Sequence, residues 1–434
     1  MIDRLLKWLD RSTSNFLACE TIVNELKGKG FEELKQNEEW EIKPNGKYFL
    51  IKNGSAVFAF TTGKGLDSFR KGSLLIAAHS DSPCLRLKPN PEIYGDGGVI
   101  SLNVEKYGGG ILYTWFDRPL SISGRITLRS DNLYEPREFI FDLRRPIAII
   151  PHLAIHFNRG VNEGNPISVQ KDMKPILGYL SPEELNGYGK KGIILNLIAK
   201  EYGLNVNDIM DYEISLYPIQ QATLTGITKE YICSGRIDDL SMAFAGLEAM
   251  LETCQEENDK FRILAIFDNE ETGSGTKQGA CSPVLRDMLE RLCFKLGGNK
   301  EDFLIGMANS FLISADDAHA WHPNYNEKYD PTNHPVIGGG PVIKINSNCK
   351  YMTDSVGAAV FKELCNKAEV KYQMFVNHSD VAGGSTLGNL LTSQIDFKGV
   401  DVGAPIWAMH SAMETAGVSD YIDFVKVFQT FWKN

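Results

Sequence analysis

Apolar positions in the first and last parts of the chain predict an α/β domain. The run SLLIAAHSDS at 73–82 is apolar at consecutive positions and ends in polar residues. That pattern is typical of a strand buried on both faces of a sheet that helices cover. Similar strands are expected at 261–269, 311–316 and 372–376, with helices at 240–254 and 282–296. These segments predict a central mixed sheet flanked by helices.

The middle of the chain has a different pattern. Short β-rich segments, separated by Gly, Asn, Asp and Pro, predict an inserted β-rich domain with a helix near 194–202. The segments are SISGRITLRS (121–130), EFIFDL (138–143), IAIIPHLAIHF (147–157) and EISLYPIQQATL (213–224). We therefore expect residues 1–92 and 230–434 to form a discontinuous α/β domain, and residues 93–229 to form the insertion.

Composition narrows the class of protein. The 434 residues are 43% hydrophobic and 23% charged, which excludes a disordered chain. A net charge of −10 argues against nucleic-acid or anionic-membrane partners. We find no apolar run long enough for a transmembrane helix, and charged residues interrupt the N-terminus as in an amphipathic helix. Eight scattered Cys indicate reduced thiols and a cytoplasmic protein.

Acidic residues and His follow several of the apolar segments. Because ligands gather outside the carboxyl ends of strands in open α/β sheets, these residues could converge on one place. They are His79 and Asp81; Asp268, Glu270 and Glu271; Asp316, Asp317 and His319; His410; and, before a helix, Asp238 and Asp239.

His and carboxylates without Cys suit Zn, with Co or Mn as alternatives. Three carboxylates and two His could hold two divalent ions around a shared water. Adjacent Glu270 and Glu271 could divide the roles of ligand and base, and Asp81 could orient His79. Each feature also has a simpler interpretation: a solvated pair of Glu, or, for Asp238 and Asp239, a helix N-cap.

The sequence resembles the M18 family of metallo-aminopeptidases, the aspartyl aminopeptidase group. The resemblance covers the whole chain in order, and its motifs are specific as a set. They are AHSDSPCLRLKP (78–89), IPHLAIHFNRGVN (150–162), GRIDDL (235–240), FDNEETGSGTKQGA (267–280), SADDAHAWHPNY (314–325), GGGPVIKINSN (338–348), GGSTLG (383–388) and MHSAMETAG (409–417).

The resemblance implies a role for each candidate. His79, Asp238 and Asp316 would hold one ion, and Asp238 would bridge to a second ion held by Glu271 and His410. Glu270 would be the general base and Asp81 the residue that orients His79. Substrate contacts would come from His156, His319, Lys344 and Tyr351. Spacing alone does not separate Asp316 from Asp317. Some relatives carry Arg where Met413 stands.

The resemblance also implies an assembly and a reaction. His156 of the insertion would reach a neighbouring subunit's site in a dodecamer built from dimers. The expected reaction removes N-terminal residues, Asp or Glu in particular, from peptides with a free N-terminus by attack of a metal-bridging hydroxide. Alternatives are a dinuclear deacylase of N-acyl amino acids and a non-catalytic metal-stabilised assembly protein. A glycosidase would not need the His ligands.

Overall fold

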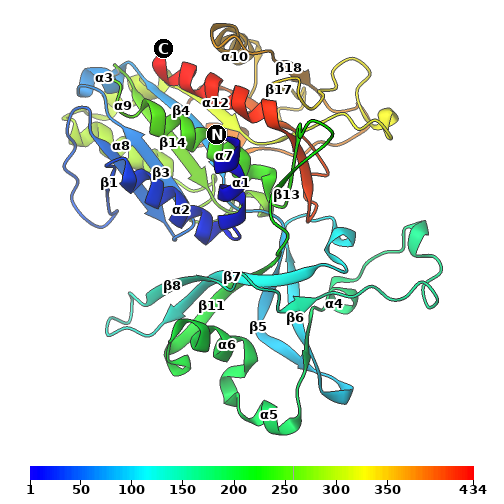
Figure 1. Ribbon diagram of the computed structural model, residues 1–434. Helices are drawn as coiled ribbons and strands as arrows, with labels where there is room; N and C mark the ends of the chain where they lie inside the picture. The colour runs from blue at the N-terminus through cyan, green and yellow to red at the C-terminus, as the bar shows by residue number, and fades with distance from the viewer. Residues whose placement is uncertain (258) are drawn as a thin grey trace. The chain divides into compact units, whose positions relative to one another are not determined.

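The computed structural model describes residues 1–257 and 259–434, which form two compact units (Figure 1). The first unit consists of Met1–Asp81, Ala222–Met409 and Glu414–Asn434. The second consists of Ser82–Gln221 and His410–Met413. The sequence predicted an insertion at 93–229, whereas the main segment of the second unit starts earlier, at Ser82, and ends earlier, at Gln221.

A mixed sheet runs through the first unit. In spatial order its strands are β1 (Glu32–Glu33), β2 (Lys47–Lys52), β3 (Ala56–Thr61), β14 (Phe261–Phe267), β4 (Ser73–His79), β15 (Phe311–Ala315), β19 (Lys398–Gly403), β17 (Val342–Lys344) and β18 (Gln373–Phe375). The four central strands, from β14 to β19, are parallel to one another. Strands β2, β3 and β14 pair antiparallel. The mixed sheet predicted from the sequence is confirmed.

Helices cover both faces of this sheet because its central strands are apolar at consecutive positions. In β4, Ile76 and Ala78 belong to one hydrophobic core, and Leu75 and Ala77 belong to the other. The first core is covered by α1 (Ile2–Arg11), α2 (Asn15–Gly28), α7 (Ile237–Thr253), α10 (Ser355–Lys367) and α12 (Val418–Lys433). The second is covered by α3 (Leu66–Arg70), α8 (Val284–Lys295), α9 (Lys300–Ala308) and α11 (Leu387–Thr392).

The first unit also contains a smaller sheet. Its order is β12 (Thr223–Thr225), β13 (Tyr231–Ser234), β21 (Glu414–Gly417), β20 (Pro405–Trp407) and β16 (Ala318–His319). Strand β13 therefore belongs to the first unit, close to the boundary expected near residue 230. None of the described helices is long and apolar enough to cross a membrane.

The second unit is an antiparallel sheet that closes on itself. Its order is β11 (Ile209–Pro218), β5 (Cys84–Tyr94), β6 (Val99–Tyr107), β10 (Ile176–Tyr179), β9 (Ala148–Ile149), β7 (Pro119–Leu128) and β8 (Arg137–Asp142), with β11 also pairing with β7. Its helices are α4 (Val169–Asp172), α5 (Pro182–Asn186) and α6 (Gly192–Tyr202). Where β7 meets β11, a Cβ on Gly124 would lie 2.1 Å from the Glu213 carbonyl oxygen, so this close approach requires glycine.

The expected β-rich segment at 147–157 is mostly irregular. Only Ala148–Ile149 forms a strand among these described residues, and Leu153, Ile155 and Phe157 are exposed. Pro151 has no N–H group with which to continue the pairing. Apolar residues in this loop therefore lie on the surface of the unit and not in its core.

Candidate metal centre

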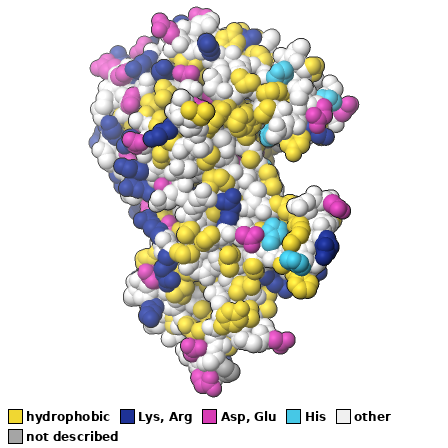
Figure 2. All heavy atoms as spheres, turned by 45° about the vertical axis from the view of Figure 1, so that its right-hand side comes forward, with side chains coloured by type: hydrophobic (Ala, Val, Ile, Leu, Met, Phe, Trp, Pro, Cys, Tyr) yellow, Lys and Arg dark blue, Asp and Glu magenta, His cyan; other side chains and the backbone are white. Residues whose placement is uncertain are grey.

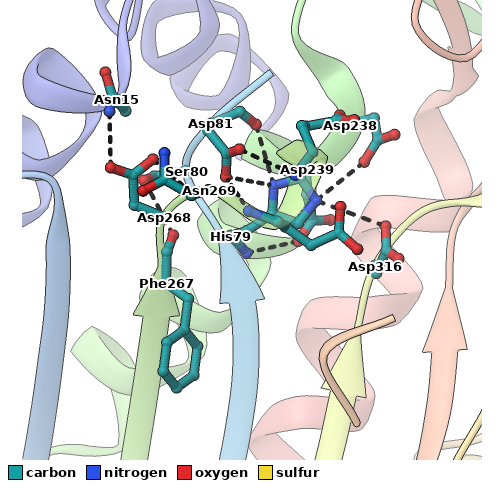
Figure 3. Close-up of polar contacts among 12 residues, drawn as sticks. Asn15, His79, Ser80, Asp81, Asp238, Asp239, Phe267, Asp268, Asn269 and Asp316 are labelled. Carbon is teal, nitrogen blue, oxygen red and sulfur yellow. Dashed lines mark hydrogen bonds and ion pairs between the residues drawn. The ribbon is translucent and has the colours of Figure 1, made fainter. Parts of the chain in front are cut away.

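Three neighbouring strands end at the same edge of the main sheet. Strands β14, β4 and β15 are parallel, and the last residue of β14, Phe267, pairs with His79 at the end of β4. The residues that follow β14 and β15 therefore meet beside His79 (Figure 3). The convergence expected from the sequence holds for His79, Asp238, Glu271 and Asp316, which all belong to the first unit.

His79 lies at the middle of this cluster and is 1% exposed. Its Nε2 lies 3.5 Å from Asp238 Oδ1 and 3.9 Å from Asp316 Oδ1, and its Nδ1 lies 3.3 Å from Asp81 Oδ1. Burial opposes protonation, but the hydrogen bond with Asp238 and the charge of Asp239 raise the pKa of His79 well above its usual value. One ring nitrogen thus faces the ligand candidates, and the other faces Asp81.

The donor set fits divalent cations. His79, Asp238 and Glu271 each bring one ligand atom within 4.8 Å of the others, and so do His79, Asp239 and Asp316. These two groups share His79, and a third group consists of Asp238, Asp239 and Asp317. Nitrogen and carboxylate oxygen donors without sulfur are a zinc-type set.

Burial of so many carboxyl groups is unfavourable without a cation. Burial and the charges of neighbouring carboxylates raise the pKa of Glu271, Asp239 and Asp317 well above their usual values. A bound divalent ion favours the ionised form and offsets this cost. The electrostatics therefore agree with the donor set.

Asp81 links His79 to the turn that carries the two Glu. Its carboxylate accepts the backbone N–H groups of Glu270 and Glu271, each at 3.1 Å. Glu271 belongs to a ligand group, whereas Glu270 belongs to none of the three groups. Burial raises the pKa of Glu270 to about 8. This arrangement supports separate roles for the two side chains.

Asp316 and Asp317 differ in their surroundings. Asp316 Oδ2 lies 3.4 Å from Lys344 Nζ, and its Oδ1 approaches His79. Asp317 is turned to α7, where it accepts a hydrogen bond of 2.8 Å from the Ser241 hydroxyl. Lys344 is 3% exposed, so it is a buried cation and not a solvated strand residue. Burial opposes its charge, but Asp316 raises the pKa of Lys344.

The other predicted site residues lie in both units. His410 belongs to the second unit, where its Nδ1 lies 3.2 Å from the Gly109 carbonyl oxygen. His156 is exposed in the same unit. In the first unit, Tyr351 is buried with its ring centroid 5.7 Å from Lys344 Nζ, and exposed His319 lies beside Phe375.

Asp238 and Asp239 do not cap a helix in the expected way. Arg236 is the N-cap of α7, and the backbone of Asp238 is extended, with a ψ of 111°. Sequence reasoning missed what holds this turn: buried Glu414 accepts the N–H groups of Ile237 (2.6 Å) and Asp238 (3.2 Å). Its signal was an acidic residue a few positions after His410 in the motif MHSAMETAG.

Comparisons with known proteins agree over nearly the whole chain. The family described as "Aminopeptidase I zinc metalloprotease (M18)" matches residues 8–432. A "Probable M18 family aminopeptidase 2" of Clostridium acetobutylicum is 44% identical over 430 residues, which are 99% of this chain and 98% of the relative.

Two solved structures share this fold and are each more than 25% identical to the chain in sequence. One, described as a complex of Ape4 and Nbr1, is 34% identical with a TM-score of 0.95, and the match covers 99% of this chain and 85% of that one. Another, described as the S. cerevesiae mApe1 dodecamer, is 26% identical with a TM-score of 0.86, covering 100% and 96%. The chain belongs to the M18 family of zinc metallo-aminopeptidases, as its motifs indicated.

Proposed function

We propose that this aminopeptidase uses two divalent ions, with zinc as the cellular metal. His79, Asp238 and Asp316 would hold one ion, and Asp238, Glu271 and His410 the other. The observation that carries this proposal is the cluster around His79: its Nε2 lies 3.5 Å from Asp238 Oδ1 and 3.9 Å from Asp316 Oδ1, and Asp238 also offers a ligand atom within 4.8 Å of one from Glu271. The role of His410 follows from the family motif, and its Nδ1 lies 3.2 Å from the Gly109 carbonyl oxygen, the kind of backbone contact that orients a ligand histidine.

The chain's own residues supply the proton transfers. Bound zinc would polarise the scissile carbonyl and lower the pKa of water. Glu270, whose carboxyl group is largely buried, would take a proton from the attacking water and pass it to the leaving amine. Asp81 would hold Glu270 in position through its backbone N–H and fix the ring of His79.

A panel of small substrates tests the reaction. We expect hydrolysis of peptides with a free N-terminus and none of the same peptides after N-acetylation. A deacylase using the same ligands would show the opposite order. Preferential release of the acyl group from N-acyl amino acids would therefore contradict the proposed reaction.

We propose a preference for acidic N-terminal residues. Lys344 is a buried cation at the edge of the ligand cluster, and a substrate carboxylate could share it with Asp316. Replacing Lys344 with methionine should lower kcat/KM for Asp-peptides relative to Leu-peptides by about ten-fold, as expected for loss of a charge-assisted hydrogen bond.

The measurement is the ratio of kcat/KM for Asp-peptides to that for Leu-peptides. If Lys344 only supported Asp316, its loss would lower kcat/KM for both kinds of peptide by the same factor. An unchanged ratio in Lys344→Met, with both rates lowered, would assign Lys344 to the support of Asp316 alone.

We propose a homo-oligomer, with the second unit as its assembly element. The described Ape1 relative is a dodecamer. In the second unit, Leu153, Ile155 and Phe157 are 58%, 48% and 81% exposed. Figure 2 shows hydrophobic side chains, drawn in yellow, on the surface of the protein. His156 lies among these residues and would enter a neighbour's site. A mass near that of one 48.4 kDa chain in light scattering would contradict this assembly.

The free thiols support the expected cytoplasmic location.

A further inference from the structure

The first two helices pack on α7 as a hairpin, defined here as residues 2–28. Leu5, Leu9 and Ile22 are buried in the core beneath it. The Trp8 indole N–H donates to the Leu240 carbonyl oxygen at 2.8 Å. Arg4 forms an ion pair with Glu248 of α7, with Nη2 and Oε1 2.5 Å apart. These contacts hold the hairpin on α7.

One further contact reaches the turn that carries Asp238. Arg236, two residues before Asp238, has a φ of 61°. Its guanidinium group donates to the carbonyl oxygens of Ser12 (3.1 Å) and Leu9 (3.2 Å). These carbonyls lie at the end of α1, where backbone acceptors lack partners within the helix. The hairpin therefore holds this turn from one side, while Glu414 holds it through the backbone N–H of Asp238.

A second contact reaches the turn that carries the two Glu. The Asn15 amide donates to Asp268 Oδ2 at 2.9 Å, and the two side chains are 7% and 1% exposed (Figure 3). Asp268 Oδ1 accepts the backbone N–H of Asn269 at 2.7 Å. Asn269 has a φ of 62° and directly precedes Glu270. Asn15 thus holds the Asp268 carboxylate, and this carboxylate in turn accepts the backbone N–H of the left-handed residue Asn269.

We propose that the hairpin is a positioning element of the metal centre, with Asn15 and Arg236 as its positioning residues. Each links the hairpin to one of two ligand-bearing turns that lie far apart in the sequence. Ligand atoms must be held within about half an ångström for tight metal binding, so a shift of either turn would weaken it. The inference rests on the proposed ligands Asp238 and Glu271.

Replacing Asn15 with leucine tests this inference. Leucine has a similar size but no donor, so Asp268 Oδ2 would lose the hydrogen bond from the Asn15 amide and the Glu270 turn would shift. We expect zinc transfer from the purified holoenzyme to a chelator to be about ten-fold faster, the lower end of effects seen for residues outside the ligand shell. We also expect kcat to fall with KM changed less than about two-fold, since substrate contacts remain.

Arg4→Met is the matched control. It also removes a polar link between the hairpin and α7, but one made to Glu248 and not to a ligand-bearing turn. We expect it to lower Tm without changing zinc release or kcat. If Asn15→Leu lowers Tm like this control and releases zinc at the wild-type rate, the inference is overturned.

Arg236→Lys keeps the charge and loses the forked donor geometry, and it provides the same test if Asn15→Leu does not fold. Faster zinc release in this variant supports the inference, and a wild-type rate contradicts it. The proposed function is tested separately by Asp238→Asn. Loss of zinc in Asp238→Asn with normal retention in both positioning variants would refute the role of the hairpin alone.

Discussion

Replacing Glu270 with glutamine should lower kcat by roughly a thousand-fold while leaving the zinc content unchanged, within the usual range for loss of a general base. Glutamine keeps the size of the side chain and the backbone N–H that Asp81 accepts, but it cannot take up a proton. Turnover of a free dipeptide and metal analysis of the same sample are the two measurements.

Glu271→Gln is the control for this variant, because the two residues are adjacent in the same turn. Glu271 offers a ligand atom together with His79 and Asp238, so its replacement should lower both activity and zinc content. Near-normal turnover in Glu270→Gln would contradict the role of Glu270 as the general base. Loss of zinc from this variant would indicate that Glu270 is a ligand instead.

The Asp238→Asn variant should lose activity and bind at most one zinc per chain. Asp238 Oδ1 lies 3.5 Å from His79 Nε2, and Asp238 also offers a ligand atom within 4.8 Å of one from Glu271, so it lies near proposed ligands of both ions. An amide removes the negative charge that would bridge two cations. The stoichiometry of tightly held zinc, measured after gel filtration, decides between one ion and two.

Asp420→Asn controls for the loss of any buried carboxylate in the first unit. Asp420 is fully buried and accepts the N–H groups of Gly338 (2.8 Å) and Gly340 (2.9 Å). Its replacement should lower stability but keep the zinc stoichiometry of the wild type. Two zinc ions retained in Asp238→Asn would refute the bridging role.

Four strands of the main sheet (β4, β14, β15 and β18) and two of the helices beside it (α7 and α8) could be predicted from local patterns. The apolar run that forms β4 and the helical periodicity that forms α7 and α8 are visible because buried strands and amphipathic helices need those spacings. The segment at 147–157 failed this test. Its apolar residues resemble a strand, but Pro151 interrupts the pairing and Ile155 and Phe157 are exposed.

The residue types of the candidate site and the family could be inferred from residue order alone, since motifs such as GRIDDL and FDNEETG are local in the chain. How these residues are held depends on contacts between distant segments. Asp316 faces His79 while its neighbour Asp317 faces Ser241, a difference that adjacent positions cannot reveal. The supporting contacts of Asn15, Arg236 and Glu414 join segments more than a hundred residues apart. Such contacts arise from packing, which no local pattern of hydrophobicity records.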